Sequence, residues 1–231
     1  MSDAFLFEKD GPVTTLTFNQ PRRRNPMNHQ VMAEMEGLIR RVRDDRETRV
    51  LITTGTGAAF SAGADLSVPK GVTDPAEQAR IIGQRNRGLA RVIGRVFDLI
   101  TRLDCLTIAA VNGYAVGGGW AIAAAFDFIL AAENAQFWVP EVDLSQSYVG
   151  GPARVMAARM GPWRAKEAMI LCRRYSAAEL YEMGMVNKVV KTEELGSQAR
   201  KLAQILAQKD QKAARGTKHF IDGAFVGPRW Y

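Results

Sequence analysis

The segment Thr107–Asp127, TIAAVNGYAVGGGWAIAAAFD, constrains the fold of this chain more than any other part of its sequence. It begins with an apolar run rich in β-branched residues, which is typical of a buried strand, and Asn112-Gly113 then marks a turn. Three glycines, Gly117–Gly119, open an alanine-rich run that favours a helix. The pattern therefore predicts a buried strand, a turn, a glycine loop and a helix N-terminus, in that order.

A glycine loop in front of a helix is suited to hold an oxygen atom of a ligand. The first N–H groups of a helix have no partner within the helix, and they carry a partial positive charge. Because glycine has no Cβ, an oxygen can approach these N–H groups closely. We therefore predict that the loop holds an oxygen that is negative or becomes so. Close packing of the helix on the strand would explain the same glycines equally well.

Two other interpretations of this segment are disfavoured. Residues 106–126 carry no charge and are numerous enough to span a membrane. Their glycines, Asn112 and the strand-like first part argue against a span, so we expect no membrane insertion. The G-x-G-x-x-G spacing of dinucleotide-binding loops is also missing from this segment.

Composition narrows the class of partner. The formal net charge is +7, which favours an anionic partner. Apart from Arg22–Arg24 the basic residues are scattered, without interleaved aromatic residues or zinc-finger spacing, so we expect no nucleic-acid binding. Cys105 and Cys172 are far apart and the chain has two histidines, which predicts no metal site and a reduced, cytoplasmic setting. The acidic N-terminal residues do not resemble a signal peptide.

The remaining sequence predicts strands and helices that alternate around one core. The long loop at 58–69 is rich in small residues and shows neither strand nor helix periodicity, which is typical of a functional or mobile loop. Strand–helix–strand spacing indicates crossover connections, so we expect an α/β fold with mainly parallel strands. The other expected strands lie at 5–7, 13–18, 50–54, 128–132, 136–138 and 186–190, and the other expected helices at 29–45, 74–103, 176–184, 192–208 and 213–225.

Three stretches together resemble the crotonase superfamily, also called the enoyl-CoA hydratase/isomerase family. They are Ala59–Leu66 (AFSAGADL), Ile108–Gly119 (IAAVNGYAVGGG) and Ala135–Glu141 (AQFWVPE). The similarity extends from about Phe5 to about Ile221. It implies an enzyme that acts on acyl-CoA thioesters through an enolate. It also implies that coenzyme A enters as part of the substrate and that no cofactor is bound permanently.

The resemblance further implies a spiral core of ββα units at residues 1–190 and a short helical C-terminal segment at 191–231. The helical region makes trimer contacts in the family, which implies a homotrimer or hexamer. Family members usually continue beyond the equivalent of Lys218–Asp222 with another helical segment, whereas this sequence ends at Tyr231. Either this is a short variant, or the cover over coenzyme A and part of the trimer contact come from elsewhere.

By position in the family, two backbone N–H groups polarise the thioester carbonyl, and they belong here to Ala64 and Gly118. The position of the general acid/base falls on Glu141, whose carboxyl group is expected to face a pocket beside Trp138. Glutamate suits this role when burial raises its pKa toward neutrality. Without the resemblance, an exposed loop glutamate would be the simpler interpretation.

The sequence departs from the family at a second acidic position, which here is Ala121. Hydratases of the family typically hold water between two carboxylates, and alanine cannot hold or deprotonate water. One carboxylate can still shuttle a proton between carbons, as an isomerase does, or activate water alone in a hydratase or lyase. The same departure motivates the alternative of a non-catalytic acyl-CoA-binding or scaffold protein.

Coenzyme A would lie on the loop that contains Ala64. Arg22 or Arg24 is expected to meet its phosphates through charge-assisted hydrogen bonds, although solvated arginines would fit the sequence too. The phenol of Tyr148 lies near the site by position and could equally be a packed tyrosine. The remaining positions assigned to the bound thioester are Ala62, Asp65, Leu66, Gly117 and Trp138.

Overall fold

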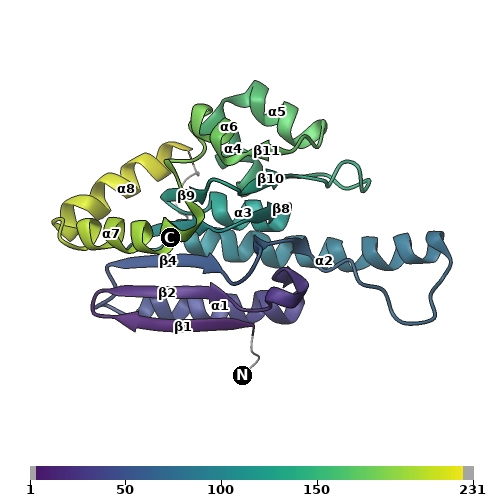
Figure 1. The fold of residues 1–231 in the computed structure, drawn as a ribbon, viewed down its shortest axis with the longest axis horizontal. Coiled ribbons are helices and arrows are strands. Elements are labelled where there is room, and N and C mark those ends of the chain that lie inside the picture. The colour runs from purple at the N-terminus through teal and green to yellow at the C-terminus, as the bar shows by residue number, and fades with distance from the viewer. Residues whose placement is uncertain (1–3, 226–231) are drawn as a thin grey trace.

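The computed structural model describes residues 4–225, and its main element is a six-stranded sheet (Figure 1). Its strand order is β1-β2-β4-β7-β9-β12. The pair β1–β2 is antiparallel and every other neighbouring pair is parallel, which confirms the expected mainly parallel α/β fold. The strands are β1 (Phe5–Asp10), β2 (Val13–Phe18), β4 (Val50–Gly55), β7 (Leu106–Val111), β9 (Phe128–Ala132) and β12 (Lys188–Val190).

Two smaller sheets consist of short strands, of which the sequence predicted only β10. One has the order β11-β10-β8-β5, and the other pairs β3 with β6. The expectation of a loop without strands at 58–69 is therefore wrong for its first half. A strand of two or three residues shows no periodicity, and its pairing is decided by partners far away in the sequence. The strands are β3 (Pro26–Met27), β5 (Ala59–Ser61), β6 (Gly63–Ala64), β8 (Tyr114–Val116), β10 (Gln136–Trp138) and β11 (Tyr175–Ser176).

Side-chain caps mark the start of several helices. Asn28 accepts a hydrogen bond from Val31 N, and Ser176 and Glu179 form a complete capping box. The longest helix, α2, extends beyond the sheet as an arm (Figure 1). The helices are η1 (Pro21–Arg23), α1 (His29–Asp44), α2 (Pro75–Thr101), α3 (Gly118–Ala124), α4 (Gly151–Met160), α5 (Pro162–Ile170), α6 (Ala177–Glu182), η2 (Thr192–Glu194), α7 (Leu195–Ala207) and α8 (Gln211–Phe225).

Strand β7 is buried on both faces, as its uncharged sequence predicts. Successive side chains of a strand point to opposite faces, so Ala109 and Val111 enter one apolar core while Ile108 and Ala110 enter another. Helix α7 supplies much of the second core, including Leu195 and neighbouring alanines. The C-terminal segment thus covers one face of the main sheet. Its separation from the core at residue 190 stays a prediction, and 226–231 lie outside the described residues.

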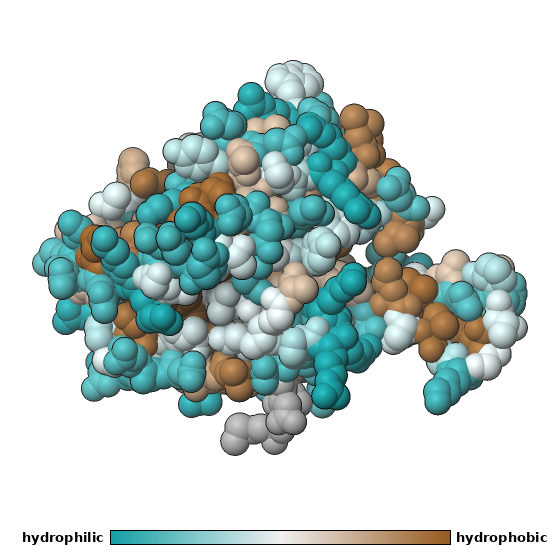
Figure 2. All heavy atoms as spheres, viewed as in Figure 1, coloured by the Kyte–Doolittle hydropathy of each residue, from teal (hydrophilic) through white to brown (hydrophobic). Residues whose placement is uncertain are grey.

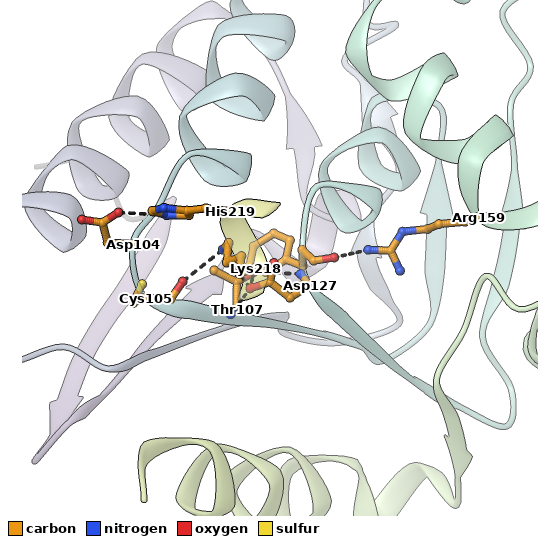
Figure 3. A network of polar contacts seen from close by, with 8 residues as sticks. Asp104, Cys105, Thr107, Asp127, Arg159, Lys218 and His219 are labelled. Carbon is orange, nitrogen blue, oxygen red and sulfur yellow. Dashed lines mark hydrogen bonds and ion pairs between the residues drawn. The ribbon is translucent and has the colours of Figure 1, made fainter. Parts of the chain in front are cut away.

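Helix α8 is attached to the rest of the fold by a buried charge (Figure 3). Lys218 is only 7% exposed, and its Nζ lies 2.8 Å from Asp127 Oδ2 and donates to the carbonyl oxygen of Cys105. Asp127 Oδ2 also accepts hydrogen bonds from the backbone N–H and hydroxyl of Thr107. The carboxylate of Asp127 therefore joins three parts of the fold: the start of β7, the chain just after α3, and helix α8.

Candidate active site

Helix α3 begins at the glycine loop that the sequence singled out. Gly117 precedes it with a φ of +50°, a conformation that side chains other than glycine rarely adopt. The first i to i−4 bond of the helix runs from Ala121 N to Gly117 O, at 2.9 Å. The N–H groups of Gly118 and Gly119 thus precede the first helical hydrogen bond and have no partner within the helix.

The short strand β6, Gly63-Ala64, lies directly against this glycine loop. Gly63 has a φ of +77°, and a Cβ built on it would collide with the carbonyl oxygen of Val116 and lie 3.5 Å from Gly118 N. A Cβ on Gly119 would likewise collide with the carbonyl oxygen of Ser61. The segment from Ser61 to Ala64 and the glycine loop therefore touch backbone to backbone, and only glycine permits this approach.

Strand β6 and the glycine loop both border one cavity of about 360 Å³. Figure 2 shows the surface hollowed between the arm formed by α2 and the part of the molecule above it, with apolar side chains on both sides. One wall is the inner face of α2 and another is the chain that follows β10. The cavity is lined by most of the residues that the sequence assigned to the site and by Ala121: Ala62, Ala64, Leu66, Gly117, Gly118, Ala121, Glu141 and Tyr148.

Glu141 is placed at this cavity by the Pro140-Glu141 turn after β10. Its carboxyl group lies against the Cα of Gly117, where a built Cβ would be 2.5 Å from Oε1. The other oxygen, Oε2, is buried and has no hydrogen-bond partner among the described residues. Burial raises the pKa of Glu141 from 4.5 to about 7, although a backbone hydrogen bond opposes the shift. A carboxyl group of this kind can both take up and give back a proton near neutral pH.

Ala121 lies one turn beyond Gly117 in α3, is 2% exposed and lines the same cavity. Among the described residues that line this cavity, Glu141 is the one acidic side chain. The methyl group of Ala121 offers no hydrogen bond to a water molecule placed opposite Glu141.

Tyr148 faces the cavity from the chain after β10, and its hydroxyl donates to Sδ of Met156 at 3.5 Å. Burial, and to a smaller extent the charge of Glu141, raise the pKa of Tyr148 above its ordinary value. The phenol is therefore protonated at neutral pH. Because a thioether is a weak acceptor, this hydroxyl remains available to a bound molecule.

Trp138 lies outside the set of residues that line the cavity. Its ring packs edge-on against Tyr114 at 5.9 Å, and the guanidinium of Arg174 lies 4.6 Å above it. Only its backbone reaches the site, because Trp138 O accepts a hydrogen bond from Gly117 N at 2.9 Å. Its assignment to substrate binding stays a prediction.

Arg22, Arg23 and Arg24, in and just after η1, lie on the surface, and Arg23 reaches the chain just after β6. Arg22 is exposed, and Arg24 lies 5.7 Å from the ring centroid of Tyr114. The residue between them, Arg23, forms an ion pair with Asp65 at 2.7 Å. This pair joins residues 42 positions apart and has no sequence signature. The roles of Arg22, Arg24 and Asp65 toward coenzyme A stay predictions.

Sequence reasoning missed several polar residues that line the cavity. Asn86 is the most informative, because it occupies a buried position on the apolar face of α2. A polar residue on an apolar stripe was a visible signal. The others are Arg91, Gln146 and Ser147.

A second cavity, of about 550 Å³, lies beside α8 and is lined in part by Asp127, Arg159 and Lys218. Its central charges are already paired within the fold: Lys218 with Asp127, and Arg159 with the carbonyl oxygen of Phe126 (Figure 3). The smaller cavity, where Glu141 Oε2 lacks a partner, is therefore the better candidate for chemistry. Within residues 4–225, no cluster of His, Cys, Asp and Glu is suited to hold a metal ion, and no helix is long and apolar enough to cross a membrane.

Comparison with known proteins decides the family. The model of the enoyl-CoA hydratase/isomerase family matches residues 8–225. The chain belongs to the enoyl-CoA hydratase/isomerase family. The crotonyl-CoA hydratase of Syntrophomonas wolfei is 35% identical over 214 residues, which cover 92% of this chain and 79% of that protein. The carnitinyl-CoA dehydratase of Citrobacter koseri is 36% identical over 207 residues, 89% of this chain and 75% of that protein.

Solved structures of this family share the fold. The crystal structure of enoyl-CoA hydratase from Bacillus anthracis matches with a TM-score of 0.85 and 29% identity, over 95% of this chain and 82% of that one. A monofunctional enoyl-CoA isomerase from M. smegmatis matches with a TM-score of 0.77 and 27% identity, over 96% and 94% of the two chains. The resemblance to crotonases and the predicted crotonase fold are thus confirmed, and this chain is an enzyme of the hydratase/isomerase class.

Proposed function

We propose that this member of the hydratase/isomerase family moves a double bond along the acyl chain of an enoyl-CoA thioester, with Glu141 as the proton carrier. One observation carries the proposal: Glu141 is the single acidic side chain among the described residues that line the cavity, and burial raises its pKa. The resemblance assigns a second carboxyl group to the position of Ala121, which cannot carry a proton. Moving a double bond needs one group that removes a proton from one carbon and returns it to another. It needs no group that holds water.

In the proposed reaction, the N–H groups of Ala64 and Gly118 donate hydrogen bonds to the thioester oxygen of a 3-enoyl-CoA. Glu141 removes a proton from carbon 2, and the electron pair moves toward the oxygen to form a dienolate. The electrons then return, the double bond forms between carbons 2 and 3, and Glu141 gives its proton to carbon 4. Each amide donor is expected to contribute about 3–4 kcal/mol to the stability of the transition state.

Hydration with Glu141 alone is the second candidate. The names of two relatives, crotonyl-CoA hydratase and carnitinyl-CoA dehydratase, favour it. A buried water typically needs about three hydrogen bonds, and Ala121 supplies none. The polar side chains of Gln146 and Ser147 also line the cavity, and they are the groups that could supply the missing hydrogen bonds to this water.

The variant Glu141→Gln tests the proposal against a panel of 2-enoyl- and 3-enoyl-CoA thioesters. Double-bond migration should fall by about 10²- to 10⁴-fold, because glutamine cannot carry the proton. Asp143→Asn is the matched control, since it removes an exposed carboxylate from the same loop. Unchanged turnover of Glu141→Gln would remove Glu141 from the mechanism. Tight thioester binding by the wild type, without conversion and without entry of solvent deuterium at carbon 2, would favour the non-catalytic alternative.

We further propose that coenzyme A enters only as part of the substrate and that the enzyme is a cytoplasmic homotrimer or hexamer. The net charge of +7 supports an anionic substrate of this kind. Mass measurement of the intact protein in solution tests the oligomeric state, and a monomer would contradict it. Strongly salt-dependent binding of DNA or RNA would contradict the expectation of no nucleic-acid partner.

A further inference from the structure

Asn86 is a buried polar side chain that the proposed reaction does not use. It is 7% exposed and lies on the inner face of α2, where most of the other buried residues are apolar. Its Oδ1 is buried and has no hydrogen-bond partner among the described residues. An unpaired buried acceptor destabilises a fold and is rarely kept without a partner. The same side chain lines the cavity that holds Glu141, so a bound molecule can supply that partner.

The position of Asn86 along α2 sets its distance from the start of α3. Ile93 touches the start of α3, since a Cβ on Gly118 would be 2.8 Å from Ile93 Cδ1. Asn86 precedes Ile93 by seven residues, so the two side chains share one helix face and stand about 10 Å apart along the axis. An extended chain covers this distance in about eight bonds.

The helix face between these two positions is apolar. Leu89 and Ala90 lie between Asn86 and Ile93 on the same face, and both line the cavity. A hydrocarbon chain suits such a surface. The pantetheine arm of coenzyme A suits it less, because it carries an amide within about three bonds of the sulfur and would leave that amide unpaired there. The ligand part that reaches Asn86 is therefore the acyl chain.

We propose that Asn86 is a specificity-determining residue that selects acyl-CoA thioesters with a hydroxyl group about eight bonds from the thioester carbon. A hydroxyl group both donates and accepts, so it pairs with either end of the side-chain amide. The inference rests on the proposed function only in taking an acyl-CoA as the occupant of the cavity. It does not depend on the role of Glu141.

Binding of saturated thioesters tests the inference without turnover. The affinity of the whole chain for octanoyl-CoA is compared with that for 8-hydroxyoctanoyl-CoA. The 6- and 10-carbon pairs place the hydroxyl group two bonds nearer to the thioester carbon or two bonds farther from it. Wild type should prefer the hydroxylated partner of at least one pair by about two- to tenfold, the range expected for one hydrogen bond. In Asn86→Ala and Asn86→Leu the preference should vanish, whereas Leu89→Met should alter both affinities alike and keep the preference.

Thermal unfolding provides a second readout. The free Asn86→Leu protein should unfold at the wild-type temperature or above it, because the unpaired acceptor is gone. A clearly lower unfolding temperature would show that the amide is paired within the fold and would overturn the inference. Equal affinity for the members of every pair would overturn it too and leave the proposed function standing. If Asn86→Ala lowered the affinity for both thioesters and for free coenzyme A by the same factor, the amide would be assigned to pantetheine. That result would overturn the inference as well. Failure of any acyl-CoA to bind wild type would overturn both.

Discussion

The Cα of Gly117 and the carboxyl group of Glu141 are in direct contact: a Cβ built on Gly117 would lie 2.5 Å from Glu141 Oε1. The positive φ of Gly117, +50°, also ends the β8 strand so that α3 can start at Gly118. One glycine thus makes room for the acid/base group and directs the first amides of the helix. The position of Glu141 therefore depends on this glycine as well as on its own loop.

Gly117→Ala should therefore reduce turnover of enoyl-CoA by about 10²-fold or more, because the added methyl group displaces the carboxyl group. It should also lower stability by about 1–3 kcal/mol through backbone strain. Steady-state kinetics and chemical denaturation measure the two effects. Gly11→Ala is the control, because Gly11 has a φ of +54° and open space around it. That variant should lose stability and keep its turnover. Wild-type turnover in Gly117→Ala would contradict the assigned position of Glu141.

The raised pKa of Glu141 predicts how stability depends on pH. The folded protein holds this proton more tightly than the unfolded chain, so the contribution of Glu141 to stability is greatest below pH 4.5 and falls as the pH rises through about 7. At pH 8 the ionised, buried group should destabilise the fold by up to about 3 kcal/mol. Denaturation of wild type and Glu141→Gln across this range checks the sign. The variant should gain stability relative to wild type only as the pH rises, and a constant difference would mean that Glu141 titrates normally.

Much of this site could be predicted from sequence because its parts are local. The start of α3 at Gly118 and the turn at Pro140-Glu141 follow from neighbouring residues, whose chemistry fixes turns and helix ends. The burial of Glu141 also agrees with the hypothesis built on its family position. For these residues, the sequence predicts the local backbone conformation.

The features that sequence reasoning missed depend on residues far apart in the chain. The pairing of β3 with β6 joins segments of two residues each, too short for any periodicity. The ion pair of Arg23 with Asp65 and the second core formed by α7 depend on the folded arrangement in the same way. Asn86 is different, because the sequence already shows a polar residue on the apolar stripe of this helix. Only the structure shows that its Oδ1 has no hydrogen-bond partner among the described residues.

Ala121→Glu tests whether the missing second carboxylate limits the reaction. Ala121 lines the cavity one turn beyond Gly117, so the new carboxyl group should lie near Glu141 and be able to hold water with it. Hydration of 2-enoyl-CoA should rise by at least about tenfold, and the two like charges should raise the apparent pKa of the pair. Absorbance and product mass follow both reactions. Ala121→Gln has the same size without the charge and should show neither change, and equal hydration in both variants would contradict the reasoning.

Lys218→Met tests whether helix α8 is held by its buried charge. The variant removes the partner of Asp127 and leaves that carboxylate buried beside Thr107, so the free energy of unfolding should fall by about 3–5 kcal/mol. Lys212→Met, at an exposed position of the same helix, should change stability by less than about 0.5 kcal/mol. Adding Asp127→Asn to Lys218→Met should recover part of the loss, because the remaining side chain no longer carries an unpaired charge. A double variant no more stable than Lys218→Met would show that packing of the lysine stem, and not the ion pair, holds α8 in place.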